Sequence, residues 1–89
     1  EIESLLITMP GLRDCAVFGI PDPEFGEQLV AAIELMPGIT IQEAEVRSFV
    51  SNHLAGFKVP KIVKFYGKLP REDSGKIFKR LLRENFALH

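Results

Sequence analysis

The chain has 89 residues, a net charge of -1 at pH 7, 46% hydrophobic residues and 26% charged residues. This length suits one domain with a single modest core, and this composition excludes an intrinsically disordered chain. No apolar run is long enough to span a bilayer, no targeting segment is recognisable, and a single cysteine excludes an internal disulfide, so we expect a cytoplasmic protein without a transmembrane segment.

The small net charge conceals a strong asymmetry along the chain. Residues 1–56 carry two basic and nine acidic side chains, a net charge of -7, whereas residues 57–89 carry nine basic and three acidic side chains, a net charge of +6. One interpretation is an anionic partner that docks on the basic half. The other is that the two halves partly neutralise each other across the fold, and the charge counts alone favour this second interpretation.

The first half of the chain predicts one helix and two strands. Apolar residues at helical spacing predict a helix over residues 1–9, which Pro10 and Gly11 end. Short apolar runs bounded by turn residues predict strands at 15–20 and 29–36. The loop between them has a length that suits an antiparallel connection.

The second half predicts a helix, a strand and a final helix. Thr40 followed by Glu43 matches a capping box, and the helix that it begins carries the apolar stripe Val46, Phe49, Val50 and Leu54, ending at Gly56. Residues 62–66 are β-branched and aromatic and predict the third strand. The order α-β-β-α-β-α predicts an α+β fold, a small domain in which helices pack on a three-stranded sheet.

A basic turn precedes the final helix. Pro70 closes the preceding element, Asp73 or Ser74 can cap the next helix, and Gly75 permits a positive φ. The predicted helix follows Lys76 directly, with one apolar face formed by Ile77, Phe78, Leu81 and Leu82. Lys76 therefore lies where a turn and a packed helix can aim one ammonium group at a fixed point.

Four segments of the chain carry a family resemblance. Residues 69–83, with Ser-Gly-Lys-Ile at 74–77, resemble the C-terminal signature of adenylate-forming enzymes: acyl-CoA synthetases, 4-coumarate:CoA ligases, luciferases and peptide-synthetase adenylation domains. Residues 54–61 resemble the second C-terminal motif of this family, an aromatic residue followed by Lys-x-Pro-Lys. Residues 1–3 resemble the start of the helix after the interdomain hinge, and residues 17–27 resemble the first strand and loop. Four matches in the right order are far more specific than any one of them.

The resemblance implies that residues 1–89 are the mobile C-terminal lid domain of an AMP-forming ligase for fatty or other carboxylic acids. Its implied partner is an N-terminal adenylation domain, which holds most of the contacts to ATP and magnesium. Such enzymes join a carboxylate to AMP and then transfer the acyl group to a thiol, usually that of CoA. By resemblance Lys76 is the catalytic lysine of the first step, where a compact cation offsets the charge at the α-phosphorus. The competing interpretation is a surface lysine in an exposed turn.

The resemblance also implies a CoA site on this domain. Phe57 could stack on adenine, Lys58 or Lys61 could meet a phosphate, and Phe25 matches an aromatic position that approaches CoA in some members. Alternatively, the two aromatic residues cap the core and Lys61 is solvated. Some CoA ligases carry an arginine where this chain has Val59, which leaves the phosphate to Lys58 or Lys61.

The remaining candidate residues carry structural predictions. Cys15 lies in an apolar strand and is predicted to be a buried core thiol. His53 has no Cys or His partner at ligand spacing, so no metal site is expected. The basic residues near the C-terminus are predicted to form a solvated face that could also touch the N-terminal domain or CoA phosphates: Arg71, Lys79, Arg80 and Arg83.

Two other functions stay open at this point. One is a lid that loads the phosphopantetheine of a carrier protein, in which case the basic face would dock that protein. The other is a non-catalytic basic module that binds nucleic acid. This last function ranks lowest because aromatic residues do not interleave with the basic residues in an RNA-binding pattern, and nucleic acid is not an expected partner. The isolated domain is expected to fold but to be inactive, because one lysine cannot hold ATP and a carboxylate in register.

Overall fold

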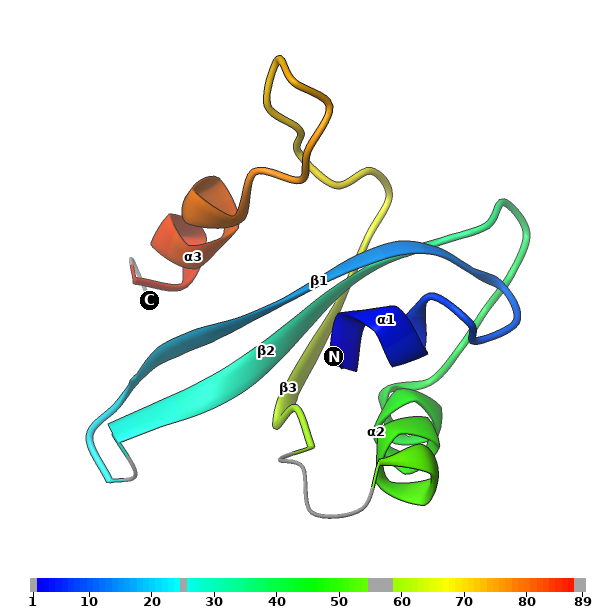
Figure 1. Cartoon of the computed structure of the whole chain (residues 1–89), viewed down its shortest axis with the longest axis horizontal. Helices are drawn as coiled ribbons and strands as arrows, with labels where there is room; N and C mark the ends of the chain where they lie inside the picture. Colours follow the sequence, from blue (N-terminus) through cyan, green and yellow to red (C-terminus); the bar gives the residue numbers. More distant parts are fainter. Residues whose placement is uncertain (1, 25, 55–58, 88–89) are drawn as a thin grey trace.

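The predicted order of elements is confirmed in the computed structural model, which describes residues 2–24, 26–54 and 59–87 (Figure 1). The helices and strands are α1 (Ile2–Leu6), β1 (Leu12–Asp22), β2 (Gly26–Leu35), α2 (Glu43–His53), β3 (Ile62–Tyr66) and α3 (Lys79–Ala87). In the residues that the structure describes, the fold is the expected α+β arrangement of three helices and a three-stranded sheet. Within the described ranges, no helix has the length and apolar character needed to cross a membrane.

The central strand of the sheet is β2. It pairs antiparallel with β1, as predicted, and parallel with β3. The parallel pair needs a crossover connection, and α2 lies in that connection. Because β2 is the central strand and both faces of the sheet are covered by helices, its residues 30–33 are fully buried and form a continuous apolar run.

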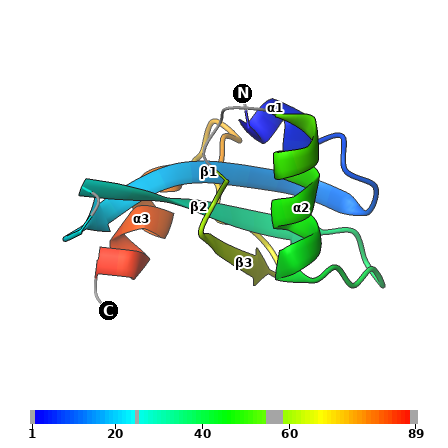
Figure 2. The same cartoon turned by 90° about the horizontal axis from the view of Figure 1, so that it is seen from below.

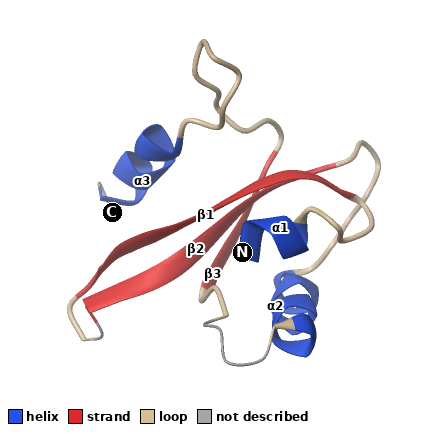
Figure 3. Ribbon diagram, in the orientation of Figure 1, coloured by secondary structure: helices blue, strands red, loops and turns tan. Residues whose placement is uncertain are grey.

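The core has two parts, one on each face of the sheet. Alternate residues of a strand point to opposite faces, so Cys15 and Ile33 pack with α1 and α2, whereas Ala16 and Ala32 pack with α3. Figure 2 shows α1 and α2 lying together, away from α3. The segment between β3 and α3 projects beyond the sheet as a loop (Figure 3), and this segment carries Lys76.

Several element boundaries differ from the prediction in the first half. The helix predicted over residues 1–9 ends at Leu6, because after the bond from Ile7 to the Glu3 carbonyl the N–H groups of Thr8 and Met9 bond to carbonyls only three residues back, as in turns. Both predicted strands are longer, and β2 begins at Gly26. The capping box at Thr40 and Glu43 is wrong: the N-cap of α2 is Gln42, whose N–H donates to the Glu45 carboxylate at 3.0 Å. The predicted stop at Gly56 lies outside the described residues.

The prediction for the final helix is wrong at its start. Helix α3 begins at Lys79 because Ile77 is used instead in a β-bridge with Arg71. Asp73 and Ser74 are therefore turn residues and not helix caps. The predicted apolar face also fails at Leu81, which is 40% exposed, whereas Leu82 is fully buried. The positive φ predicted for Gly75 is confirmed, at 94°.

Candidate functional site

A short hairpin fixes the backbone around Lys76. Arg71 and Ile77 pair across it, the Glu72 N–H donates to the Lys76 carbonyl at 2.8 Å, and the Gly75 N–H donates to the Glu72 carbonyl at 2.8 Å. Only a residue without a side chain adopts the φ of Gly75 without strain, so this turn explains the glycine before Lys76. The Phe78 N–H also donates to the Pro70 carbonyl at 2.8 Å, which closes the hairpin at its base.

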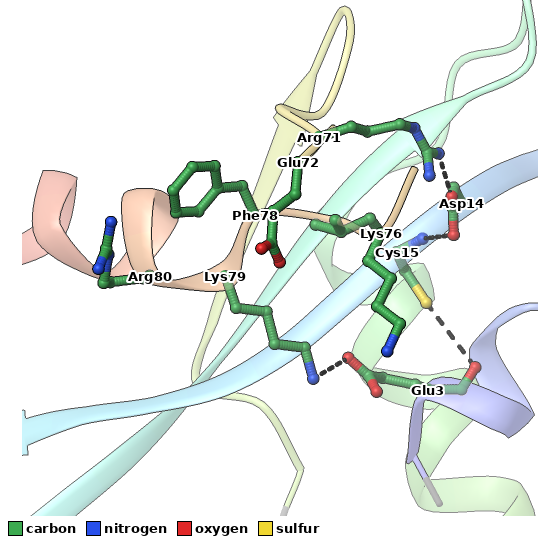
Figure 4. Close-up of a pocket in the computed structure, with 10 residues that line it drawn as sticks. Glu3, Asp14, Cys15, Arg71, Glu72, Lys76, Phe78, Lys79 and Arg80 are labelled. Carbon is green, nitrogen blue, oxygen red and sulfur yellow. Dashed lines mark hydrogen bonds and ion pairs between the residues drawn. The ribbon is translucent and has the colours of Figure 1, made fainter. Parts of the chain in front are cut away.

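The Lys76 side chain lines an open pocket of about 680 Å³. The pocket lies between α1, β1, the hairpin and the start of α3, and Figure 4 shows the Lys76 side chain pointing toward Glu3. Its lining residues are Glu3, Asp14, Cys15, Arg71, Glu72, Lys76, Ile77, Phe78, Lys79 and Arg80. In residues 2–24, 26–54 and 59–87, no side chain or carbonyl forms a hydrogen bond or ion pair with the Lys76 ammonium. Lys76 can therefore offer its positive charge to a ligand in the pocket.

Two ion pairs flank Lys76. The Arg71 guanidinium pairs with Asp14 of β1, and the Lys79 ammonium lies 2.8 Å from the Glu3 carboxylate of α1 (Figure 4). The same oxygen of Glu3 accepts the Val17 N–H at 2.6 Å. Each pair joins the acidic half of the chain to the basic half, so the predicted neutralisation across the fold is confirmed at these two contacts.

The predicted solvated basic face needs correction. Arg71 and Lys79 are held by carboxylates and so are not simply solvated. Arg80 and Arg83 are exposed, as predicted, but both have contacts of their own. Arg80 lies over the Phe78 ring at 5.3 Å, and Arg83 donates from Nε to the Gly19 carbonyl at 3.2 Å.

A buried carboxylate anchors the segment that leads to the hairpin. Glu34 of β2 is only 7% exposed; its Oε1 accepts the Leu69 N–H at 2.9 Å and its Oε2 lies 3.4 Å from Arg13 Nε. Glu34 was not predicted as a site residue, although an acid within an apolar strand was a usable signal. Glu3 and Asp14 were not predicted as site residues either, and the sequence carries no such signal for them.

Cys15 lies beside the pocket but is a buried core thiol, as predicted. It is 6% exposed, and its Sγ lies 3.7 Å from the Glu3 carbonyl. Burial raises its pKa to about 12, and the negative charges of Glu3 and Asp14 add to this effect, whereas Lys79 opposes it. At neutral pH the side chain is therefore a protonated thiol and a poor nucleophile.

The predicted CoA residues are only partly described. Phe25, Phe57 and Lys58 lie outside the described residues. Lys61 is exposed, its backbone N–H donates to the Leu29 carbonyl at 3.1 Å, and it is not among the residues that line the Lys76 pocket. In the described part of the chain, no group of three or more His, Cys, Asp or Glu residues could hold a metal ion. The Nδ1 atom of His53 lies 2.8 Å from the Phe49 carbonyl oxygen.

Comparison with known proteins gives consistent matches. The family described as AMP-binding enzyme C-terminal domain matches residues 1–76, a range that reaches Lys76. The chain is 42% identical over 87 residues to a feruloyl-CoA synthase of Amycolatopsis, and 43% identical over 82 residues to 4-hydroxybutyrate–CoA ligase 2 of Metallosphaera sedula. These matches cover 98% and 92% of the chain, which spans only 18% and 15% of the length of the two relatives.

A solved structure gives the same match at the level of the fold. ATP-bound MatB from Rhodopseudomonas palustris superposes with a TM-score of 0.88 and is 42% identical in sequence. The match covers 96% of this chain and 17% of the MatB chain.

Proposed function

The chain belongs to the family of AMP-binding enzyme C-terminal domains, and we propose that residues 1–89 are the lid domain of an ATP-dependent, AMP-forming acyl-CoA synthetase. In this proposal an N-terminal adenylation domain holds the acyl group and most of the contacts to ATP and magnesium. The lid adds one cation from Lys76 and part of the CoA site. The length of the relatives supports such a partner domain, because the chain spans less than a fifth of each.

The proposed role of Lys76 is in acyl-adenylate formation. A carboxylate that attacks the α-phosphorus of ATP brings two anionic groups together. An ammonium placed against both groups orients the carboxylate and offsets the charge that develops between them. The observation that carries this proposal is the combination of a hydrogen-bonded hairpin with an ammonium group that has no ionic partner within the described ranges.

The proposed acceptor of the acyl group is CoA. The names of the feruloyl-CoA synthase and the 4-hydroxybutyrate–CoA ligase support this choice. The two names specify different acids, so the acid that this protein uses has to be found by assay. We propose that Phe57, Lys58, Lys61 and Phe25 contribute to the CoA site, as the family resemblance implies. The phosphopantetheine of a carrier protein is the alternative acceptor.

The test is ATP–pyrophosphate exchange by the full-length ligase with a panel of carboxylic acids. We expect exchange with one class of acid and a loss of about 10²–10³-fold in Lys76→Ala, because one electrostatic contact to the reacting centre is removed. Lys68→Ala is the matched control, since Lys68 is also exposed and lies outside the pocket. Normal exchange by Lys76→Ala would refute the role of Lys76. Acyl transfer to a carrier protein and not to CoA would replace the proposed acceptor.

A further inference from the structure

An irregularity in the sheet directs Asp14 toward the lysine hairpin. Leu12 pairs with Leu35 but Asp14 pairs with Glu34, so the register of β1 and β2 shifts by one residue at Arg13. Such a β-bulge bends its strand and changes the direction of nearby side chains. Asp14 uses Oδ1 to accept the Cys15 N–H at 2.9 Å, and its Oδ2 pairs with Arg71, which lies 57 positions later in the chain. The bulge thus brings a carboxylate from β1 to the base of the hairpin.

The other half of the connection runs through the Arg71 guanidinium. One of its terminal nitrogens pairs with Asp14, and the other donates to the Gly75 carbonyl at 2.9 Å. Gly75 immediately precedes Lys76, so the second bond holds the peptide group that leads into the lysine. A planar guanidinium fixes both acceptors at once, whereas a lysine ammonium at the same position carries no such rigid fork.

We propose that Arg71 and Asp14 are positioning residues for Lys76 in acyl-adenylate formation. The connection from Asp14 through Arg71 to the Gly75 carbonyl ties the lysine-bearing turn to the bulge in β1, so the backbone of Lys76 keeps one position beside the pocket and its side chain starts from a fixed point. Arg71 acts through Lys76 and does not touch the substrate. The inference rests on the proposed function of Lys76 and adds to it the residues that hold the lysine in place.

The size of the effect separates this role from a contribution to folding. Asp14 and Arg71 are partly exposed, with side chains 26% and 39% accessible, and pairs of this kind add little to stability. A reacting group displaced by about 1 Å can lose about 10²-fold in rate. The variants should therefore lose activity in the step that uses Lys76 while they keep their fold.

The experiment measures the two half-reactions of the full-length ligase separately. Pyrophosphate exchange reports adenylation, and thioester formation from supplied acyl-adenylate reports the second step. We expect Arg71→Ala and Asp14→Asn each to lower kcat for adenylation by about 10- to 100-fold, with KM for ATP and the second step changed by about twofold or less. The double variant should lose little more than either single variant, because both break the same connection. Arg71→Lys should not restore the rate.

Arg47→Ala is the matched control. Arg47 is an arginine of similar exposure on α2 that pairs with Glu43 at 3.5 Å, and its loss should change neither step. Equal losses in both half-reactions together with a lower Tm would overturn the inference in favour of a structural role. A raised KM for ATP in Arg71→Ala with normal Asp14→Asn would overturn it in favour of direct substrate contact.

The Lys76→Ala variant, measured in parallel, separates this inference from the proposed function. If Lys76→Ala loses adenylation but Arg71→Ala and Asp14→Asn keep it, the positioning role is wrong and the role of Lys76 stands. If Lys76→Ala adenylates normally, the proposed function fails and the positioning role fails with it. Asp14→Asn keeps the shape of the side chain, so it provides a folded variant even if Arg71→Ala is unstable.

Discussion

Replacement of Glu34 is expected to destabilise the domain through one hydrogen bond in particular. The Glu34 carboxylate is buried in the sheet and accepts the N–H of Leu69, a residue that is itself 1% exposed. In Glu34→Ala this N–H loses its acceptor at a site that has little access to water. A buried N–H without an acceptor lowers the free energy of unfolding by about 1–3 kcal/mol.

The second partner of Glu34 contributes less. The Arg13 side chain is 58% exposed and its Nε lies 3.4 Å from the carboxylate, so solvent screens the pair and limits it to about 0–1 kcal/mol. Together these contacts predict a loss of about 1–4 kcal/mol in Glu34→Ala. Glu34→Gln keeps an oxygen that can accept the Leu69 N–H, so we expect it to lose only about 1 kcal/mol.

Urea unfolding at pH 7, followed by circular dichroism, gives the free energy of unfolding for each variant. Arg13→Ala is the matched control, because it removes the ion pair and keeps the hydrogen bond to Leu69. We expect it to cost less than about 1 kcal/mol. If Glu34→Gln and Arg13→Ala each destabilise the domain as much as Glu34→Ala, the charge pair and not the buried hydrogen bond carries the contribution, and the reasoning is refuted.

Two further predictions concern buried groups with raised pKa values. Burial raises the pKa of Cys15 from 9.0 to about 12. The folded state therefore favours the protonated thiol, and this stabilisation is complete below about pH 9 and is lost as the pH rises toward 12. The expected loss is about 1 kcal/mol at pH 10, and unfolding curves of Cys15→Ala should lack this part of the alkaline decline; an identical decline in that variant would contradict the assignment. The Tyr66 hydroxyl is buried with no hydrogen-bond partner in the described part of the chain, and burial raises its pKa. Tyr66→Phe should therefore be neutral or stabilising by up to about 1 kcal/mol, and a clear loss of stability would mean that the hydroxyl has a partner.

The fold was largely predictable because its elements carry short-range signals. Apolar periodicity, strand composition and turn residues act over a few positions, and they led to the correct order of elements and the correct fold class. Boundaries were less predictable where two local patterns competed. Ile77 suits a helix by its spacing, but it pairs with Arg71 across the hairpin, and this delays the start of α3 to Lys79.

Of the candidate site, the sequence predicted Lys76 but not the carboxylates that lie around it. Lys76 could be proposed as a site residue because its motif lies within a few positions of the sequence. Asp14 and Glu3 come from distant elements, and no pattern near either residue names its partner. Arg71 and Lys79 were consequently predicted to be solvated, although each is paired with a carboxylate.

The sequence by itself determined the α-β-β-α-β-α order, the family and the lysine of interest, since each of these depends on residues that are neighbours in the chain. Only the tertiary structure decided which carboxylates meet the cations around that lysine. The reason is that the Asp14–Arg71 pair spans 57 positions and forms only when a bulge in β1 and a hairpin between β3 and α3 pack against each other. Such contacts depend on how whole elements are placed, and local sequence patterns do not encode that placement.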